Sequence, residues 1–163
     1  MAKVFRFRRI DLVQDWDTLV AFHRDVFRIS HGSDREFSEQ AYREILRDRL
    51  RSFPDGQMLA VAGDAVAGQV EIWIREYEGT KIGYVSLFYL APQWRGKGLG
   101  LELVQYAERC FAARGLKEYH LRVSERNEPA LRFYLRAGFV KLHAETRDGL
   151  VTWRMGKRIQ RPA

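Results

Sequence analysis

The chain has 163 residues, of which 46% are hydrophobic and 30% are charged, and this balance excludes a disordered or fibrous protein. Its single cysteine, Cys110, excludes an internal disulfide and any multi-cysteine zinc site. The net charge of +7 favours an anionic partner without separating nucleic acid from lipid or from a phosphorylated small molecule.

No stretch reads as a linker, an internal repeat or a secretory signal, so we expect a single domain over residues 1–163. No apolar run approaches the ~20 residues that a membrane helix requires. We therefore expect a cytoplasmic protein with no membrane partner.

Two helices and the first strands are predicted in the N-terminal half. An alternating run over residues 4–10 predicts a strand, and apolar residues at helical spacing between Trp16 and Phe27 predict a helix. A turn-rich break follows at residues 29–37, and Ser38 can cap a second helix. The apolar stripe of that helix is expected to consist of Tyr42, Ile45, Leu46 and Leu50. Three further strands are predicted over residues 58–62, 68–76 and 82–90.

In the C-terminal half, strands alternate with helices. A helix ending at Gly115 is followed by a strand over residues 118–123 and a short helix opened by Pro129. A hairpin of residues 139–145 and 150–155, turning at Asp148 and Gly149, closes the chain. The order β-α-α-β-β-β-α-β-α-β-β predicts a mixed α/β (α+β) domain with at least one parallel strand pair.

The segment from Pro92 to Gly100 joins a buried strand to an amphipathic helix and contains glycine at positions 96, 98 and 100. Glycines allow close approach of a ligand to the backbone, and the first amides of a helix have no internal partner. Such a loop suits an anion, above all a pyrophosphate, and Arg95 and Lys97 add positive charge. The spacing fits neither a Walker loop nor a dinucleotide-binding fingerprint, which leaves a ligand-free glycine turn as the alternative.

The pattern Gln93-x-x-Gly96-x-Gly98 resembles the acetyl-coenzyme A signature of the GNAT superfamily of N-acetyltransferases. The resemblance implies that the loop amides from about Arg95 through Gly98, Leu99 and Gly100 bind the pyrophosphate of acetyl-coenzyme A. It also implies that the strand edge at Phe88, Tyr89 and Leu90 pairs with the pantetheine amides like an added strand.

A second motif, from Asn127 to Phe139, is similar to the family pattern Asn-x-x-Ala-x-x-Phe-Tyr-x-x-x-Gly-Phe. The resemblance implies cofactor contacts from Asn127, Ala130 and Phe133, and it implies that Tyr134 protonates the departing thiolate. A phenol, with an ordinary pKa of about 10, keeps its proton at neutral pH. From the local sequence alone, without the family resemblance, Asn127 is interpreted as a helix cap and Tyr134 as a tyrosine of the core.

The resemblance as a whole implies a GNAT-like domain whose central, twisted, mostly antiparallel sheet of about six or seven strands is flanked by about four helices. It implies direct transfer of an acetyl group to a primary amine in a ternary complex, with no metal, in the gap between strands 82–90 and 119–123. A backbone amide near Leu90 would polarise the thioester carbonyl. A non-catalytic acyl-coenzyme A-binding or sensing module is the alternative.

The residue that takes the proton from the amine is the least defined part of the site. We expect Glu71, because a carboxylate partly buried beside Trp73 has a raised pKa. The alternatives are a residue of the central strand (Tyr84, Ser86 or Tyr89), His120, or water. Cys110 falls on a buried stripe and is expected to be inert.

The acceptor is not defined by any motif. Four acidic residues suggest a cationic amine, small or part of a peptide: Asp34, Glu36, Glu71 and Glu76. His31 is expected to lie near the acceptor or to have no role, and His23 is expected in the core. Arginines near both chain ends suggest nucleic-acid binding, but no recognition motif accompanies them, so no nucleic-acid partner is expected. A monomer and a homodimer, and acyl groups other than acetyl, remain open.

Overall fold

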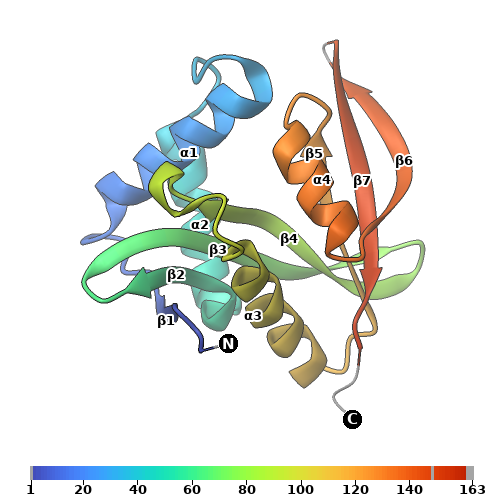
Figure 1. The fold of residues 1–163 in the computed structure, drawn as a ribbon, viewed down its shortest axis with the longest axis horizontal. Helices are drawn as coiled ribbons and strands as arrows, with labels where there is room; N and C mark the ends of the chain where they lie inside the picture. Colours follow the sequence, from blue (N-terminus) through green and yellow to red (C-terminus); the bar gives the residue numbers. More distant parts are fainter. Residues whose placement is uncertain (1, 148, 161–163) are drawn as a thin grey trace.

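In this computed structural model, which describes residues 2–147 and 149–160, seven strands form one sheet in the order β1-β2-β3-β4-β5-β7-β6 (Figure 1). The strands are β1 (Arg6–Arg9), β2 (Gln57–Ala62), β3 (Ala65–Tyr77), β4 (Thr80–Leu90), β5 (Glu118–Ser124), β6 (Val140–Arg147) and β7 (Leu150–Arg158). β4 and β5 pair in parallel, and the other neighbouring strands pair antiparallel. The predicted mixed, mostly antiparallel sheet is confirmed.

Four helices accompany the sheet: α1 (Trp16–His31), α2 (Glu39–Ser52), α3 (Gly100–Ala113) and α4 (Glu128–Arg136). The element order matches the predicted one, and the Ser38 hydroxyl caps α2 by accepting from the Ala41 amide at 3.2 Å. α1 is longer than predicted, because it continues until Gly32, whose φ of 83° ends it with a left-handed residue. No helix in the described part of the chain is long and apolar enough to cross a membrane.

Each face of the sheet has its own core. On one face, α3 and α4 bury Leu103, Phe111 and Tyr134 against β3, β4 and β5. On the other face, α1 and α2 bury Leu19 and Leu46 against β2 and β4. The prediction that Ile45 belongs to the buried stripe of α2 is wrong, since its side chain is 50% exposed beside the fully buried Leu46.

The two central strands separate along part of their length. Parallel pairing joins Gly83, Tyr84 and Val85 of β4 to Tyr119, His120 and Leu121 of β5, although β4 continues to Leu90 and β5 to Ser124. A bulge in β4 lies where the separation begins, because Glu71 pairs with Leu87 and Ile72 with Val85, which leaves Ser86 without a partner on β3. We call the space between β4 residues 86–90 and β5 residues 122–124 the gap.

Candidate functional site

The glycine-rich loop lies at the end of β4, on the way into α3. A short 3-10 turn at Pro92–Trp94 leads to Gly96 and Gly98, whose φ angles are 73° and 76°. A β-carbon added at either glycine would meet no atom within 4 Å, so the loop backbone is uncovered on that side. Both positions need glycine for their backbone conformation, and both leave room for a ligand to reach the main chain.

The amides of this loop are free to bind an anion. In the described part of the chain, the amides of residues 96–99 donate to no backbone or side-chain acceptor. The side chain of Leu99, which precedes α3, does not cap the helix, so the positive end of the helix dipole is also open. Residues 95–98 are exposed. The arrangement fits a diphosphate held by main-chain nitrogens.

The side chain of Arg95 does not extend over the loop. Its Nε donates to the Leu90 carbonyl at 2.8 Å and its Nη2 donates to Asp25 Oδ2 at 2.8 Å. The Arg95 amide donates to the Pro92 carbonyl at 3.2 Å, so the free amides begin at Gly96. Of the two basic side chains in the loop, Lys97, whose Nζ lies 5.7 Å from the centre of the Trp94 ring, is therefore the one left to bring a positive charge to an anion. Gln93 is exposed beside it.

Asp25 links α1 to the loop. It accepts from the Tyr89 hydroxyl at 2.6 Å as well as from Arg95. Burial alone would raise the pKa of Asp25, but the hydrogen bonds from Tyr89 and Arg95 outweigh it and lower the pKa. Burial and the nearby carboxylate raise the pKa of Tyr89, which keeps this phenol protonated. Its hydroxyl is therefore a structural donor to α1.

The edge of β4 offers backbone groups to the gap. The Ala91 amide donates to the Ala67 carbonyl of β3 at 2.8 Å, and the ladder continues at Tyr89, which pairs with Gln69. Because successive residues of a strand direct their backbone groups to opposite sides, the amides and carbonyls of Phe88 and Leu90 are directed away from β3. Because the Leu90 carbonyl already accepts from Arg95 Nε, an extended chain in the gap can pair with Phe88 and with the Leu90 amide, as the family resemblance implies for pantetheine.

Across the gap, α4 begins with the predicted cap and carries Tyr134. The Asn127 Oδ1 accepts from the Ala130 amide at 3.3 Å. Tyr134 is 9% exposed, and its ring centre lies 6.4 Å from that of Phe88 on β4. Burial raises the pKa of the Tyr134 phenol, and no described residue accepts from its hydroxyl. A protonated phenol without a protein partner is thus placed beside the strand edge that lines the gap.

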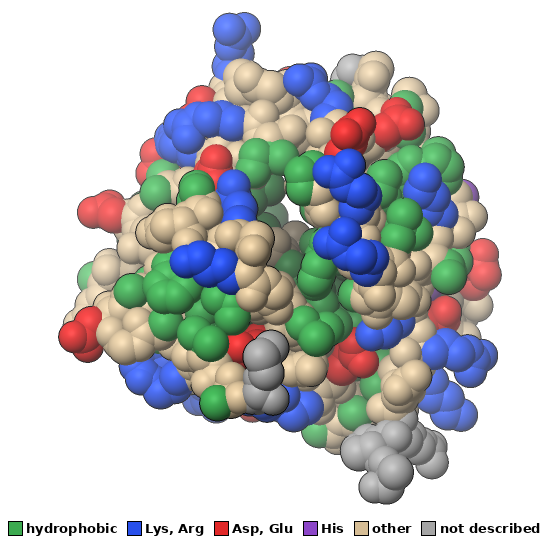
Figure 2. All heavy atoms as spheres, in the orientation of Figure 1, with side chains coloured by type: hydrophobic (Ala, Val, Ile, Leu, Met, Phe, Trp, Pro, Cys, Tyr) green, Lys and Arg blue, Asp and Glu red, His purple; other side chains and the backbone are tan. Residues whose placement is uncertain are grey.

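Phe133 lies next to Tyr134 and connects α4 to the start of α3. Its ring lies 3.0 Å from the position of a β-carbon added at Gly100. The two motifs therefore meet in space, since the loop at residues 92–100 and the helix at residues 128–136 touch through this pair. Figure 2 shows the surface hollowed between the loop and α4, with Lys and Arg side chains on both sides of the hollow.

Glu71 is more deeply buried than the strand pattern indicates. It is 3% exposed and lies under α1 and α2, where its Oε2 is 3.0 Å from His23 Nε2 and its Oε1 accepts from the Tyr42 hydroxyl at 3.3 Å. His23 Nδ1 lies 2.9 Å from the Leu19 carbonyl, which can only accept, so Nδ1 carries a hydrogen. The contact between His23 and Glu71 therefore needs one further proton, held by the ring or by the carboxyl group.

The pairing of His23 with Glu71 was not predicted. The sequence indicated His23 as a core residue of a helix and Glu71 as a glutamate on a strand, with nothing to connect the two. The other candidate bases have partners of their own. Ser86 Oγ accepts from Arg49 at 2.8 Å and from Trp73 Nε1 at 2.9 Å. His120 is fully buried, and its Nδ1 accepts from Arg154 Nε at 3.0 Å.

Cys110 lies on α3, outside the gap. Its Sγ is 3.9 Å from the Asp55 carbonyl, and burial raises the pKa of the thiol. A thiol with a raised pKa is a poor nucleophile at neutral pH, which agrees with the prediction of an inert cysteine. His31, at the end of α1, borders a cavity of about 170 Å³ that Arg122 and Ser124 of β5 also line.

The sequence matches one known family and several individual proteins. Residues 16–139 match the family described as Acetyltransferase (GNAT) family. The chain is 27% identical over 126 residues to N-alpha-acetyltransferase 30 of Schizosaccharomyces pombe, covering 76% of this chain and 84% of that protein. It is 33% identical over 93 residues to mycothiol acetyltransferase of Nocardiopsis dassonvillei. This match covers 53% of this chain but only 28% of that protein.

Among solved structures, the fold is similar to a chain in the crystal structure of the NatC complex bound to Gag peptide and CoA. The TM-score is 0.76 with 15% sequence identity, and the match covers 96% of this chain and 99% of the other. At that identity the likeness concerns the fold. The overall fold therefore has a counterpart among solved structures.

Proposed function

This chain belongs to the acetyltransferase (GNAT) family, and we propose that it transfers the acetyl group of acetyl-coenzyme A to the nitrogen of an amine. The observation that carries the proposal is the loop at residues 96–99, whose uncovered amides have no acceptor among the described residues and lie at the open start of α3. The relatives are named N-alpha-acetyltransferase 30 and mycothiol acetyltransferase, so they differ, and family membership supports acetyl transfer without fixing the acceptor.

The residues present fit coenzyme A in two places. The amides of Gly96, Lys97 and Gly98 suit its diphosphate, and Leu99 and Gly100 start the helix behind them. The backbone groups of Phe88 and the amide of Leu90 suit the amide-bearing arm, whereas the Leu90 carbonyl already accepts from Arg95 Nε. When bound, acetyl-coenzyme A supplies an activated thioester. The protein orients this thioester, binds the negative charge of the diphosphate and provides the groups that donate and accept protons.

Tyr134 is proposed as the acid that donates a proton to the leaving thiolate. Its raised pKa keeps the phenol protonated, and its hydroxyl is free of protein acceptors. The ring centres of Phe88 and Tyr134 lie 6.4 Å apart, and this contact holds the phenol against β4. A positioned acid of this kind contributes roughly 10²–10⁴-fold to a rate.

The proton of the attacking amine is proposed to leave toward Glu71. This carboxylate faces the side of the sheet opposite to Tyr134, and the deep burial means that a proton reaches it through His23, Tyr42 or water rather than by direct contact. Most of the rate gain is assigned to placing the amine against the thioester in the gap, which converts a bimolecular step into an intramolecular one.

The proposal is tested by two measurements on the full chain. Isothermal titration calorimetry with coenzyme A reports binding, and release of free thiol from acetyl-coenzyme A in the presence of an amine panel reports transfer. We expect binding and amine-dependent thiol release. Binding with no transfer to any amine would favour a non-catalytic acyl-coenzyme A module, and the absence of both would reject the proposal.

A further inference from the structure

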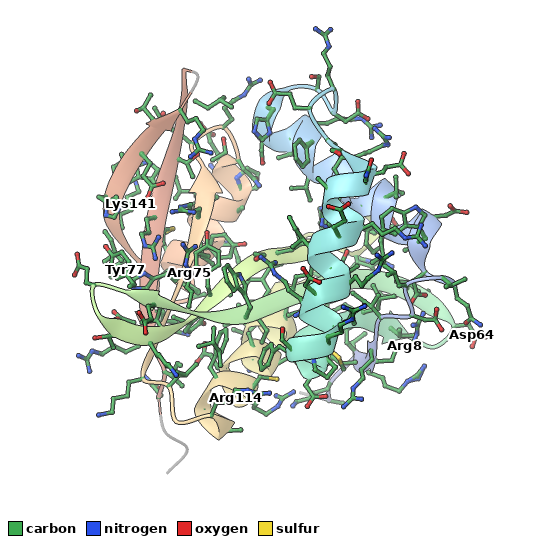
Figure 3. The ribbon with its side chains drawn as sticks, turned by 180° about the vertical axis from the view of Figure 1, so that it is seen from behind. Arg8, Asp64, Arg75, Tyr77, Arg114 and Lys141 are labelled. Carbon is green, nitrogen blue, oxygen red and sulfur yellow. The ribbon has the colours of Figure 1, made fainter. Side chains whose placement is uncertain are left out.

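One half of the sheet face that α1 and α2 share is not covered by a helix. α2 packs over β2 and β4, while the ends of β3 and β4 together with β5 and β7 lie beside it (Figure 3). Arg75 and Tyr77 lie on this uncovered half (Figure 3). We call the surface formed by Arg49, Arg75, Tyr84, Arg122 and Arg154 the arginine face.

The arginines of this face surround one aromatic side chain. The guanidinium carbons of Arg75, Arg122 and Arg154 lie 4.9, 5.8 and 5.8 Å from the centre of the Tyr84 ring. Arg49, from α2, lies 4.5 Å from the centre of the neighbouring Trp73 ring. Four positive charges thus gather over the aromatic rings of Tyr84 and Trp73.

Carboxylates compensate only one of these charges. Arg122 pairs with Glu145 at 3.1 Å, but no carboxylate of the described residues lies within 4 Å of the guanidinium nitrogens of Arg49, Arg75 or Arg154. Glu71 is bound to His23, and Asp34 is bound to Arg28 at 2.7 Å. Of the acids that suggested a cationic acceptor, Glu71 and Asp34 are therefore already paired.

Arg154 gives an independent indication that a ligand belongs here. It is 3% exposed, its Nε donates to His120, and its Nη2 is buried without any partner. A buried guanidinium nitrogen without an acceptor is costly, so such groups are normally satisfied by a protein group, an ordered water or a ligand, and among the arginines of this face Arg154 has this unmet requirement. Burial and the charge of Arg122 both lower the pKa of Arg154, as expected where positive charges remain uncompensated.

The arginine face lies where the gap opens on the side opposite to the glycine-rich loop. Tyr84 pairs with His120 and Val85 with Leu121 in the last rungs between β4 and β5. The next residues along the two strands are Ser86, which Arg49 contacts at 2.8 Å, and Arg122. A molecule that enters the gap from this side therefore passes between two guanidinium groups.

We infer that the acceptor is an amine that carries its own anionic group, a carboxylate or a phosphate, and that this group binds the arginine face while the nitrogen enters the gap. The inference rests on the proposed acetyl transfer and adds the chemical class of the acceptor. Guanidinium groups bind carboxylate and phosphate through paired hydrogen bonds. Both a small amino acid and a peptide with an acidic side chain offer this chemistry.

The test compares matched amines that differ only in the anionic group. The small-molecule arm uses phosphoethanolamine against ethanolamine and β-alanine against propylamine, and the peptide arm uses tetrapeptides with Asp against Asn at the second residue. We expect kcat/KM to be at least about tenfold higher for the anionic member of one arm, the gain of one charge-assisted hydrogen bond. The arm that shows the preference identifies the source of the anion.

Arg75→Gln and Arg122→Gln should remove most of that preference while leaving the Kd for coenzyme A unchanged. Arg109→Gln, which removes one charge from the exposed side of α3, is the matched control and should retain it. Transfer to neutral or cationic amines with no anionic preference, or a preference that survives both variants, would overturn the inference and leave the proposed function standing. Loss of coenzyme A binding in the unmodified chain would instead overturn the proposed function.

Discussion

The ring of Phe133 in α4 occupies the space into which a side chain on Gly100 would project, 3.0 Å from the position of its β-carbon. This contact joins the first residue of α3 to the helix that carries Tyr134. The contact fixes the position of Tyr134 beside the gap, because any displacement of Phe133 also moves Tyr134, the next residue of α4.

We expect Gly100→Ala to shift Phe133 and to weaken coenzyme A binding severalfold. Overpacking costs about 1–3 kcal/mol, while alanine gains up to about 1 kcal/mol in helix propensity, so the net loss of stability should be small. Calorimetry and urea unfolding measure the two effects. Adding Phe133→Leu should restore the affinity, and an unchanged affinity in Gly100→Ala alone would contradict the predicted coupling.

Gly98→Val should reduce the affinity for coenzyme A by more than about tenfold, because a branched side chain covers the free amides. Gly63→Val is a matched control, since Gly63 also has a positive φ, 59°, and open space around its β-carbon, but it lies in the turn between β2 and β3. Both variants should lose roughly 1–2 kcal/mol of stability through backbone strain. Equal Kd values for the two variants would refute close approach at Gly98.

Tyr134→Phe should lower kcat by about a hundredfold or more with little change in KM for acetyl-coenzyme A, since only the acid is removed. Tyr119→Phe is the control: its buried hydroxyl donates to Glu108 Oε2 at 2.7 Å, outside the gap. That variant should lose about 1 kcal/mol of stability and keep its kcat. Full turnover of Tyr134→Phe with a verified acceptor would remove Tyr134 as the acid.

Glu71→Gln should lower kcat by about a hundredfold, because an amide cannot accept the proton of the attacking amine. Glu76→Gln removes the same charge from an exposed position on the same strand and should leave kcat unchanged. Release of free thiol from acetyl-coenzyme A measures kcat for both variants. An unchanged kcat in Glu71→Gln would assign the proton to another group.

His120 should make the stability of the protein depend on pH. Burial, with the charge of Arg154, lowers the pKa of the imidazole below its ordinary value. The unfolded chain therefore takes up a proton at about pH 6.5 while the folded chain resists it, so stability is full above that pH and falls below it. Urea unfolding between about pH 8 and pH 5 should show this decline.

His120→Gln should flatten the decline, because glutamine can accept from Arg154 without titrating. His143→Gln, at an exposed position on β6, is the control and should keep the wild-type slope. The same slope in wild type and His120→Gln would show that another group governs the pH dependence.

The parts of the fold that local chemistry determines could be predicted from the sequence. Ser38 caps α2 and Asn127 caps α4 through bonds to amides three residues away, so both helix starts are visible in the chain itself. The glycine-rich loop was predictable for the same reason, since Gly96 and Gly98 need their positive φ angles whatever surrounds them.

Contacts between distant segments could not be predicted. The bond between His23 and Glu71 joins residues 48 apart, and the bond between Arg95 and Asp25 joins residues 70 apart. Both depend on how α1 lies against the sheet. The arginine face likewise arises only because β5 pairs with β4 and β7, which brings Arg122 and Arg154 to Tyr84.

The sheet separates the glycine-rich loop from the arginine face, and each side has its own core. Substitution of Arg75 or Arg122, which contact the Tyr84 ring, therefore leaves the hydrogen bonds of the glycine-rich loop intact. On the proposed assignment, a lineage that exchanges Arg75 or Arg122 takes up a new acceptor while its hold on the acyl carrier persists. The same partition makes this scaffold suited to redesign, because selectivity can be altered without rebuilding carrier recognition.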